Sequence, residues 1–271
     1  MRAPATAKLN LALVVGPTRA DGKHEVATVL QRLALADRVE LKPAARLTVD
    51  GFADDTLVRD ALASLAADGG VAPRWHARIT KRIPVAAGLG GGSSDAATAL
   101  RLANATLATP LEPGRLHELA RELGADVPFF LAQGPQLGEG EGAELTPLAL
   151  PQDYFVLLLH PRNASKTSTA ASYAEFDERG GANGWEERRR ALRDALAQVE
   201  RPRDLAALPT NDLAGSPYSD ELRARGAFRA DVSGAGPVVY GLFHHRRVAL
   251  EAQRRLRARG RTWLTEPAWY G

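Results

Sequence analysis

Apolar and polar residues alternate strictly close to the N-terminus of the chain. Leucine or valine stands at every second position over residues 9–15, and Lys8 and Asn10 take alternating positions beside them. This period of two predicts a half-buried strand over residues 7–15, with both polar side chains pointing away from the core. The same alternation interrupts the apolar run after the basic start, which argues against a signal peptide.

Shorter apolar patterns predict the remaining elements. Apolar runs indicate strands within residues 27–41, 75–80 and 154–160, and on both sides of a glycine turn within 228–243. Helical spacing and end signals indicate helices at 56–67, 113–124, 185–199, 219–226 and 246–259. One more helix is expected after the glycines at 88–92, capped by Ser93, Ser94 or Asp95. The segment 125–134 is expected to be extended because Val127 precedes a proline, and the residues EGEG at 139–142 predict a turn.

Strands and helices are mixed along the whole chain, which predicts a fold of the α/β or α+β class. A length of 271 residues suits one large domain or two smaller ones that share a cleft. Pro147 and Pro151 flank the expected seam between them. We therefore predict one domain at 1–150 and a second at 151–271.

The composition removes several classes of function. The chain has no cysteine, which excludes disulfides, thiolate nucleophiles and cysteine-ligated metals and favours a cytoplasmic enzyme. It has no apolar run of the roughly 18 residues that a membrane helix needs. Its 35 basic and 32 acidic residues leave a net charge of +3. Because this charge is dispersed, it is compatible with an anionic ligand and does not by itself indicate nucleic acid.

The candidate chemistry centres on the sequence PVAAGLGGGSSDAATAL, which begins at residue 84 and holds four glycines within residues 88–92. The phosphate loop that ends in glycine, lysine and serine or threonine is excluded, because no lysine follows the glycines. A dinucleotide fingerprint would find Ser93 where its third glycine belongs, and a nucleophilic serine lacks its flanking pattern. A ligand-free turn and a phosphate site remain. The position between a strand and a helix start favours phosphate, because free backbone N–H groups there bind anions.

Two further polar residues have candidate roles. Asp126 follows a predicted helix end, where it is either a capping residue or a group presented to a ligand. Lys8 is either a solvated lysine or a functional cation. The periodicity does not show whether the fold brings the two together.

A set of motifs in fixed order resembles one family of small-molecule kinases. These are APATAKLNLALVV, RADGKHEVATVLQRLALADRV, KRIPVAAGLGGGSSDAATAL, LGADVPFF, EGEGAELTPL, ND at 211–212 and SGAGPVVYGLF. Together they run from about residue 3 into the 240s. They are similar to the GHMP kinases, the superfamily of galactokinase, homoserine kinase, mevalonate kinase and phosphomevalonate kinase, and most of all to one family within it.

The resemblance implies a two-domain GHMP kinase fold. The expected parts are an N-terminal domain like ribosomal protein S5 domain 2, which binds ATP, and a ferredoxin-like C-terminal domain. The implied activity is transfer of the ATP γ-phosphate, with Mg²⁺, to the 2-hydroxyl of a cytidine-diphosphate-linked methylerythritol in the non-mevalonate isoprenoid pathway. ATP and this small molecule are the expected ligands, with no nucleic acid or membrane partner. The Mg²⁺ ligands and the oligomeric state stay open.

The resemblance also implies roles for individual residues. Lys8 and Asp126 match the family's catalytic pair, with Asp126 as general base and Lys8 as its charge partner. The residues that match the ATP-phosphate loop are Pro84, Val85, Ala86, Ala87, Gly88, Leu89, Gly90, Gly91, Gly92, Ser93 and Ser94. The residues expected near the acceptor substrate are Asn10, Lys23, His24, Thr169 and Tyr173, with His24 and Tyr173 at the cytosine.

The chain departs from the family pattern at three positions. Lys23 stands where a tyrosine is typical, which removes one aromatic wall from the expected cytosine site. Thr56 replaces an asparagine near the expected adenine contact, and Ala235 replaces a common serine.

Two alternatives remain open beside the kinase for the cytidylyl compound. Lys23 alone supports another GHMP-type kinase, for example one for mevalonate or homoserine. Arginine-rich stretches at 186–193 and 246–259 suggest a nucleic-acid-binding protein, although such runs are more often solvated helix faces.

Overall fold

The computed structural model describes residues 1–52, 56–162, 164 and 168–268. Their contacts divide the chain into two compact units, each made of several segments. The first unit comprises Met1–Ala7, Leu35–Val85 and Gly90–Gln133. The second unit comprises Lys8–Ala34, Ala86–Leu89 and Gly134–Gly271.

These units differ from two consecutive domains that meet at residue 150. Two long strands, β1 (Arg2–Thr18) and β2 (His24–Pro43), each contribute residues to both units. Residues 134–150 belong to the second unit, together with the C-terminal half of the chain. As an assignment of family domains, the expected boundary between 150 and 151 stays a prediction.

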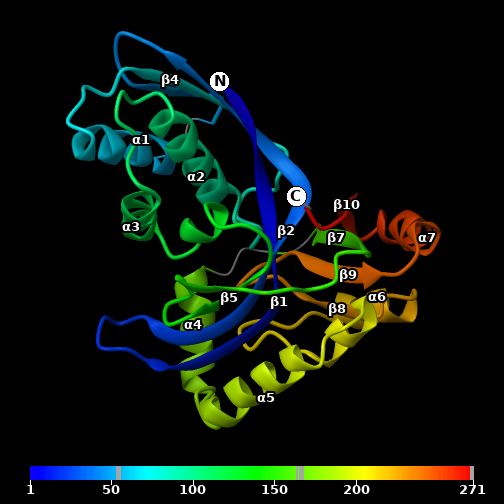
Figure 1. Cartoon of the computed structure of the whole chain (residues 1–271). Helices are drawn as coiled ribbons and strands as arrows, with labels where there is room; N and C mark the ends of the chain where they lie inside the picture. Colours follow the sequence, from blue (N-terminus) through cyan, green and yellow to red (C-terminus); the bar gives the residue numbers. More distant parts are fainter. Residues whose placement is uncertain (53–55, 163, 165–167, 269–271) are drawn as a thin grey trace. The chain divides into compact units, whose positions relative to one another are not determined.

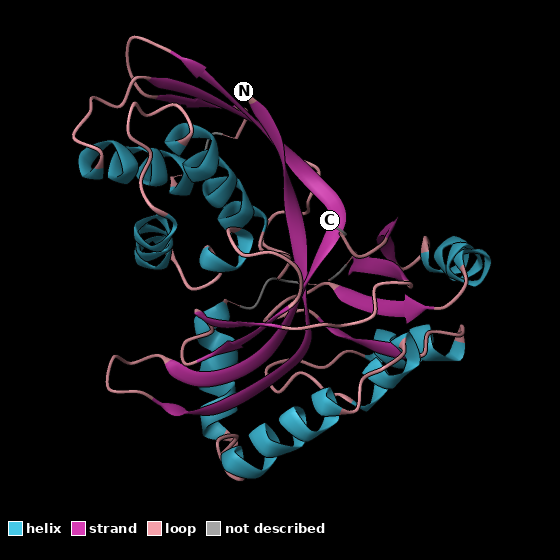
Figure 2. Ribbon diagram, viewed as in Figure 1, coloured by secondary structure: helices cyan, strands magenta, loops and turns pink. Residues whose placement is uncertain are grey.

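The first unit combines a small sheet with three helices (Figures 1 and 2). The end of β2 pairs antiparallel with β4 (Trp75–Thr80), and β4 pairs in parallel with β3 (Thr48–Asp50). Helix α1 (Leu57–Asp68) contacts β3 and packs against both α2 (Gly91–Asn104) and α3 (Pro113–Leu123), while α2 also contacts β4. A short 3₁₀ turn, η1 (Pro128–Phe130), follows α3.

Apolar periodicity explains this packing. In α1 the buried positions recur at helical spacing: Val58, Ala61, Leu62, Leu65 and Ala66. In α2 all positions from Ser94 to Asn104 except Arg101 are buried, and its alanines let neighbouring elements approach closely. The predicted helices at 56–67 and 113–124 and the strand at 75–80 are therefore confirmed.

The second unit contains a four-stranded antiparallel sheet in the order β10-β7-β9-β8. Its strands are β7 (Phe155–Pro161), β8 (Arg229–Val232), β9 (Val239–Phe243) and β10 (Gly260–Thr265). Two helices, α6 (Pro217–Ala224) and α7 (Arg246–Leu256), share one core cluster with this sheet and cover one of its faces. This strand order is that of a ferredoxin-like fold, as expected, and the mixed class is confirmed.

The second unit also contains the start of β2, a β-hairpin, two helices and a 3₁₀ segment. Residues Thr28–Leu30 of β2 pair antiparallel with β5 (Gln136–Glu139), and β5 forms a hairpin with β6 (Glu144–Pro147). The predicted turn at 139–142 makes this hairpin, with Gly140 and Gly142 at positive φ. Two helices, α4 (Thr169–Glu178) and α5 (Trp185–Ala197), and the 3₁₀ segment η2 (Pro202–Ala207) follow β7.

Several local predictions were wrong. Lys8 and Asn10 are buried, with 4% and 5% of their surface exposed, although the alternation placed them on an outward face. Helix α2 begins at Gly91 with Gly90 at its N-cap, so no serine or aspartate caps it. Val127 has helical dihedrals and enters a 3₁₀ turn instead of an extended segment. Helix α4 and strand β10 were not predicted.

Candidate active site

Lys8 and Asn10 form a buried polar pair on β1, within the second unit. The Lys8 ammonium donates to Asn10 Oδ1 at 2.7 Å. Asn10 Nδ2 in turn donates to Thr28 Oγ1 on β2 at 2.8 Å, and Thr28 donates to the carbonyl of Ala12 at 2.8 Å. Burial of a cation is costly unless hydrogen bonds hold it, so this chain of bonds fixes where the Lys8 charge stands.

The middle of the glycine loop, residues 86–89, lies against the same part of β1. The backbone N–H of Lys8 donates to the carbonyl of Leu89 at 3.0 Å, and Ser233 Oγ donates to the carbonyl of Gly88 at 2.9 Å. Gly88 has a φ of 79°, and a Cβ there would lie 2.1 Å from the Ser233 carbonyl oxygen. Only glycine therefore permits this close approach of two backbone segments.

A second glycine turn, residues 233–236, also lies beside Lys8. A Cβ on Gly234 would lie 3.3 Å from Asn10 Oδ1 and 3.7 Å from Lys8 Nζ. The buried Asn211 fixes this turn, because its Nδ2 donates to the carbonyls of Val232 at 3.0 Å and Gly234 at 2.6 Å. Sequence reasoning recognised the glycines here and missed Asn211 and Ser233 as their supports.

The ends of the glycine loop belong to the first unit. Gly90 adopts a left-handed conformation (φ 67°), and α2 starts at the next residue. The first N–H groups of a helix have no partner within it, so they are available to an anion. Ala86 has a φ of 56°, the only positive φ outside glycine in the part of the chain that the structure describes. Such a strained conformation is typical of functional loops.

Asp126 lies in the turn between α3 and η1, in the first unit, and is half-buried. Its placement just past a helix end agrees with the sequence-based expectation. Lys8, the other residue of the expected pair, belongs to the second unit, and the pairing of the two stays a prediction. Thr56 occupies the N-cap of α1 without a side-chain cap bond, and Asp54 and Asp55 before it lie outside the described residues.

His24 and Tyr173 form an aromatic pair within the second unit. Their rings are stacked with centroids 4.6 Å apart, and the edge of Phe176 lies against His24. His24 Nε2 is 2.8 Å from Asp177 Oδ1, so helix α4 holds the imidazole by both a ring and a carboxylate. Thr169 starts this helix, which Ser168 caps. The structure thus places His24 beside Tyr173 and Asp177, and the expected role of His24 and Tyr173 at the cytosine stays a prediction.

Lys23 is exposed, and its ammonium forms an ion pair with Glu141 of the turn between β5 and β6. Lys23 also follows the turn at Asp21, whose carboxylate accepts from the Lys23 N–H at 3.1 Å. The lysine charge is therefore directed toward an acidic side chain in the same unit.

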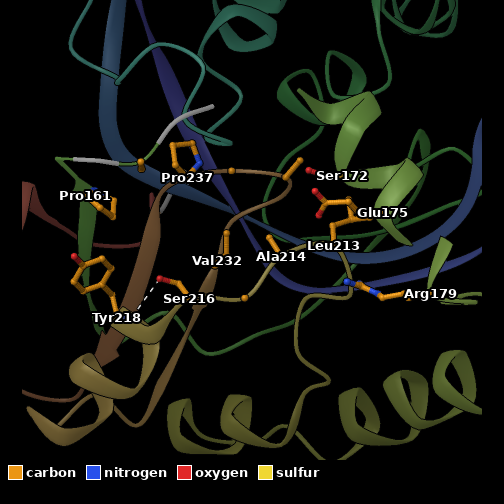
Figure 3. Close-up of a pocket in the computed structure, with 14 residues that line it drawn as sticks. Pro161, Ser172, Glu175, Arg179, Leu213, Ala214, Ser216, Tyr218, Val232 and Pro237 are labelled. Atoms are coloured by element: carbon orange, nitrogen blue, oxygen red, sulfur yellow. Dashed lines mark hydrogen bonds between the residues drawn. The ribbon is translucent and has the colours of Figure 1, made fainter. Parts of the chain in front are cut away.

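A pocket of about 440 Å³ lies beside α4 in the second unit (Figure 3). Ser172 and Glu175 of α4 line one side, Tyr218 lines the other, and Val232 and Ala214 lie between them. No predicted site residue lines this pocket. Ala235 and Gly236 of the turn at 233–236 also line it.

The described residues contain no group of three or more histidine, aspartate or glutamate side chains that could hold a metal ion. Mg²⁺ in phosphoryl-transfer sites is usually bound by one or two carboxylates and the substrate's own phosphates, so this finding leaves the expectation of Mg²⁺ untested. None of the helices described is long and apolar enough to cross a membrane.

Two family models match the chain. The model of the GHMP kinases N terminal domain matches residues 56–134, which include the glycine loop and Asp126. The model of the GHMP kinases C terminal matches residues 218–262, which include the turn at 233–236. The chain thus belongs to the GHMP kinases.

Individual relatives narrow the assignment. The chain is 37% identical over 267 residues to a 4-diphosphocytidyl-2-C-methyl-D-erythritol kinase of Anaeromyxobacter sp. (strain Fw109-5), covering 92% of this chain and 84% of the relative. It is 35% identical to the enzyme of the same name from Geobacter sulfurreducens, covering 94% of each. A crystal structure of 4-(cytidine 5'-diphospho)-2C-methyl-D-erythritol kinase matches the full length of both chains with a TM-score of 0.80 and 32% identity. The chain belongs to the 4-diphosphocytidyl-2-C-methyl-D-erythritol kinase family and is a small-molecule kinase.

Proposed function

We propose that this kinase transfers the γ-phosphate of ATP to the 2-hydroxyl of 4-diphosphocytidyl-2-C-methyl-D-erythritol, in the non-mevalonate route to isoprenoid precursors. The observation that supports it best is the match to relatives of this name over nearly the whole chain. The buried Lys8 beside two glycine turns adds a site suited to phosphate chemistry.

In this proposal the glycine loop binds the ATP phosphates. The residues 84–94 combine glycines at positive φ with the free N–H groups at the start of α2, and both favour an anion. Mg²⁺ would neutralise charge between the β- and γ-phosphates when it is bound. Ser93 and Ser94 are candidates for its ligands, with the remaining positions left to phosphate oxygens and water.

Asp126 is proposed as the general base and Lys8 as its charge partner. A hydroxyl is a poor nucleophile at neutral pH, so a carboxylate that accepts its proton during phosphoryl transfer lowers the barrier. A nearby ammonium keeps the carboxylate ionised and offsets charge on the transferred group. The supporting observation for Lys8 is its burial with a fixed hydrogen-bond partner, and for Asp126 its position in a turn within the matched N-terminal family segment.

The acceptor is proposed to bind near Asn10, His24, Thr169 and Tyr173. His24 is held by Tyr173 and Asp177, which presents one imidazole edge in a fixed orientation for a base. Lys23 stands where a tyrosine is typical of the resembled family and pairs with Glu141. We infer that Tyr173 supplies the aromatic stacking here and that Lys23, whose ammonium is paired with Glu141, supplies no second ring.

The test is ATP turnover with the cytidylyl acceptor, followed by coupled detection of ADP. Asp126→Asn should lower kcat roughly 10²–10⁴-fold while the circular dichroism spectrum stays that of the wild type. Turnover of mevalonate or homoserine without turnover of the cytidylyl compound would reject the proposed acceptor. Near-normal turnover by Asp126→Asn would reject only its role as base.

A further inference from the structure

A buried cluster of three charged side chains flanks the glycine loop in the first unit. Lys81, just before the loop, places its ammonium 2.5 Å from Asp37 Oδ2 and 2.7 Å from Asp95 Oδ2. Both aspartate side chains are fully buried, and that of Lys81 is 16% exposed. Asp37 comes from β2 and Asp95 is the first residue after the loop, on α2.

The same cluster fixes the backbone on the entry side of the loop. Asp37 Oδ1 accepts from the backbone N–H of Arg82 at 2.5 Å and of Ile83 at 2.8 Å. Asp37 therefore holds the chain immediately before Pro84, and Lys81 ties that point to Asp95 immediately after Ser94. A Cβ on Gly91 would lie 3.3 Å from Lys81 Nζ, so the ammonium stands beside the first residue of α2.

The two carboxylates of the cluster stabilise the positive charge of Lys81. Burial alone would lower the pKa of Lys81, but the carboxylates of Asp95 and Asp37 outweigh it and raise the pKa above the usual value. Lys81 is therefore charged at neutral pH. A buried charged cluster costs desolvation that apolar residues would avoid, so stability alone is a poor reason for it.

We propose that Lys81, Asp37 and Asp95 are positioning residues that hold both ends of the glycine loop in the shape that binds the ATP phosphates. This proposal rests on the proposed role of the loop and adds how that loop is set. Because Asp37 and Asp95 are both joined to Lys81, a change at either end alters the span that the loop must bridge.

The test variant is Asp95→Asn, which keeps the side-chain shape and removes the charge that Lys81 binds. The Kd for ADP, measured by calorimetry, should rise about tenfold, which corresponds to about 1.4 kcal/mol. The KM for ATP should rise similarly while the KM for the acceptor stays within about twofold. Amide hydrogen exchange within residues 84–94 should become faster, while the exchange rates of the amides in α3 should stay unchanged.

The matched control is Arg115→Met, which removes the ion pair that joins Arg115 to Asp68 in the same unit. It should leave ADP binding and loop exchange unchanged. Lys81→Met should reproduce the effect of Asp95→Asn, and Lys81→Arg, which keeps the cation between the two aspartates, should bind ADP more tightly than Lys81→Met. Should Lys81→Met not fold, Asp95→Asn and Lys81→Arg still decide.

Wild-type ADP affinity and loop exchange in Asp95→Asn would overturn the proposal. An equal rise of both KM values together with faster exchange throughout the first unit would also overturn it, because that result indicates only a stability role. Absence of acceptor turnover in the wild type with intact ADP binding would reject the proposed acceptor and leave this inference standing.

Discussion

Gly88 is the residue at which the backbone leaves least room in the candidate site. It combines a φ of 79° with a distance of 2.1 Å between its hypothetical Cβ and the Ser233 carbonyl oxygen. Gly88→Ala should therefore push residues 86–89 off the Ser233 turn, with a loss of roughly 1–3 kcal/mol in the free energy of unfolding and weaker ATP binding. Urea unfolding and the KM for ATP measure both effects.

Gly114→Ala is the control. Gly114 lies in α3 with open space around it, so alanine there should stabilise the folded protein. Unchanged ATP binding in Gly88→Ala would show that the contact between residues 86–89 and the Ser233 turn does not matter for ATP binding.

Asn211 and Asn104 allow the support of the Gly234 turn to be separated from stability in general. Each is a buried asparagine whose amide clamps a loop, Asn211 at Gly234 and Asn104 at both backbone groups of Leu111. Replacing either with alanine should cost about 1–3 kcal/mol of unfolding free energy, because buried backbone groups lose their partners. Only Asn211→Ala should also lower kcat, by roughly ten- to a hundredfold, since its turn lies beside Lys8. Equal kcat values in the two variants would refute a positioning role for Asn211.

At the scale of elements, Glu139 of β5 joins α5 to the hairpin. It lies 2.9 Å from Arg189 and 2.7 Å from Arg193. Burial would raise the pKa of Glu139, but the hydrogen bonds from these arginines outweigh it and lower the pKa below 4.5. A lowered carboxyl pKa contributes stability that is present above pH 4.5 and is lost as the pH falls through the folded-state value.

Glu139→Gln should thus be less stable than the wild type by up to about 1 kcal/mol near neutral pH. The difference should shrink at a pH well below 4.5. Urea titrations at both pH values test this, with Arg190→Gln, on an exposed position of the same helix, as a variant without effect. A difference that does not depend on pH would show that the ion pairs are not its cause.

The same ion pairs show that part of the arginine-rich stretch at 186–193 binds acidic partners within its own unit.

Helices and strands with a regular apolar stripe could be predicted from the sequence. The distant segments that pack against them could not. Helix α1 buries residues at regular helical spacing, whereas α4 buries only Ser172 and Phe176 and gives no such signal. The alternation around Lys8 showed correctly which side chains share a face of β1. It could not show that residues 86–89 and 233–234, far along the chain, cover that face. The site motifs were recognisable because local glycine patterns mark them, while Asp37 and Asn211 act through partners distant in sequence.

At the scale of the whole molecule, neither unit is a continuous piece of chain. The sheet β10-β7-β9-β8 has one face covered by α6 and α7, from the same C-terminal half. Residues on the other face are also fully buried: Val156, Leu158, Tyr240 and Leu242. Tyr240 donates to the carbonyl of Leu11 at 3.2 Å, and Leu33 forms a β-bridge with Pro267. Segments of β1 and β2 thus complete the second unit.

A fragment of residues 151–271, cut at the boundary that the prolines suggested, should therefore not fold cooperatively. Without residues 8–34 it exposes the second face of its sheet, and burial of each large apolar side chain there is worth about 1.5–3 kcal/mol. We expect the fragment to bind a hydrophobic dye and to show shallow urea unfolding, and added fragment 1–150 to restore a cooperative transition. The control is the intact chain under the same conditions. A fragment that unfolds cooperatively, with slow amide exchange in β7 and β9, would mean that α6 and α7 alone suffice to stabilise the sheet.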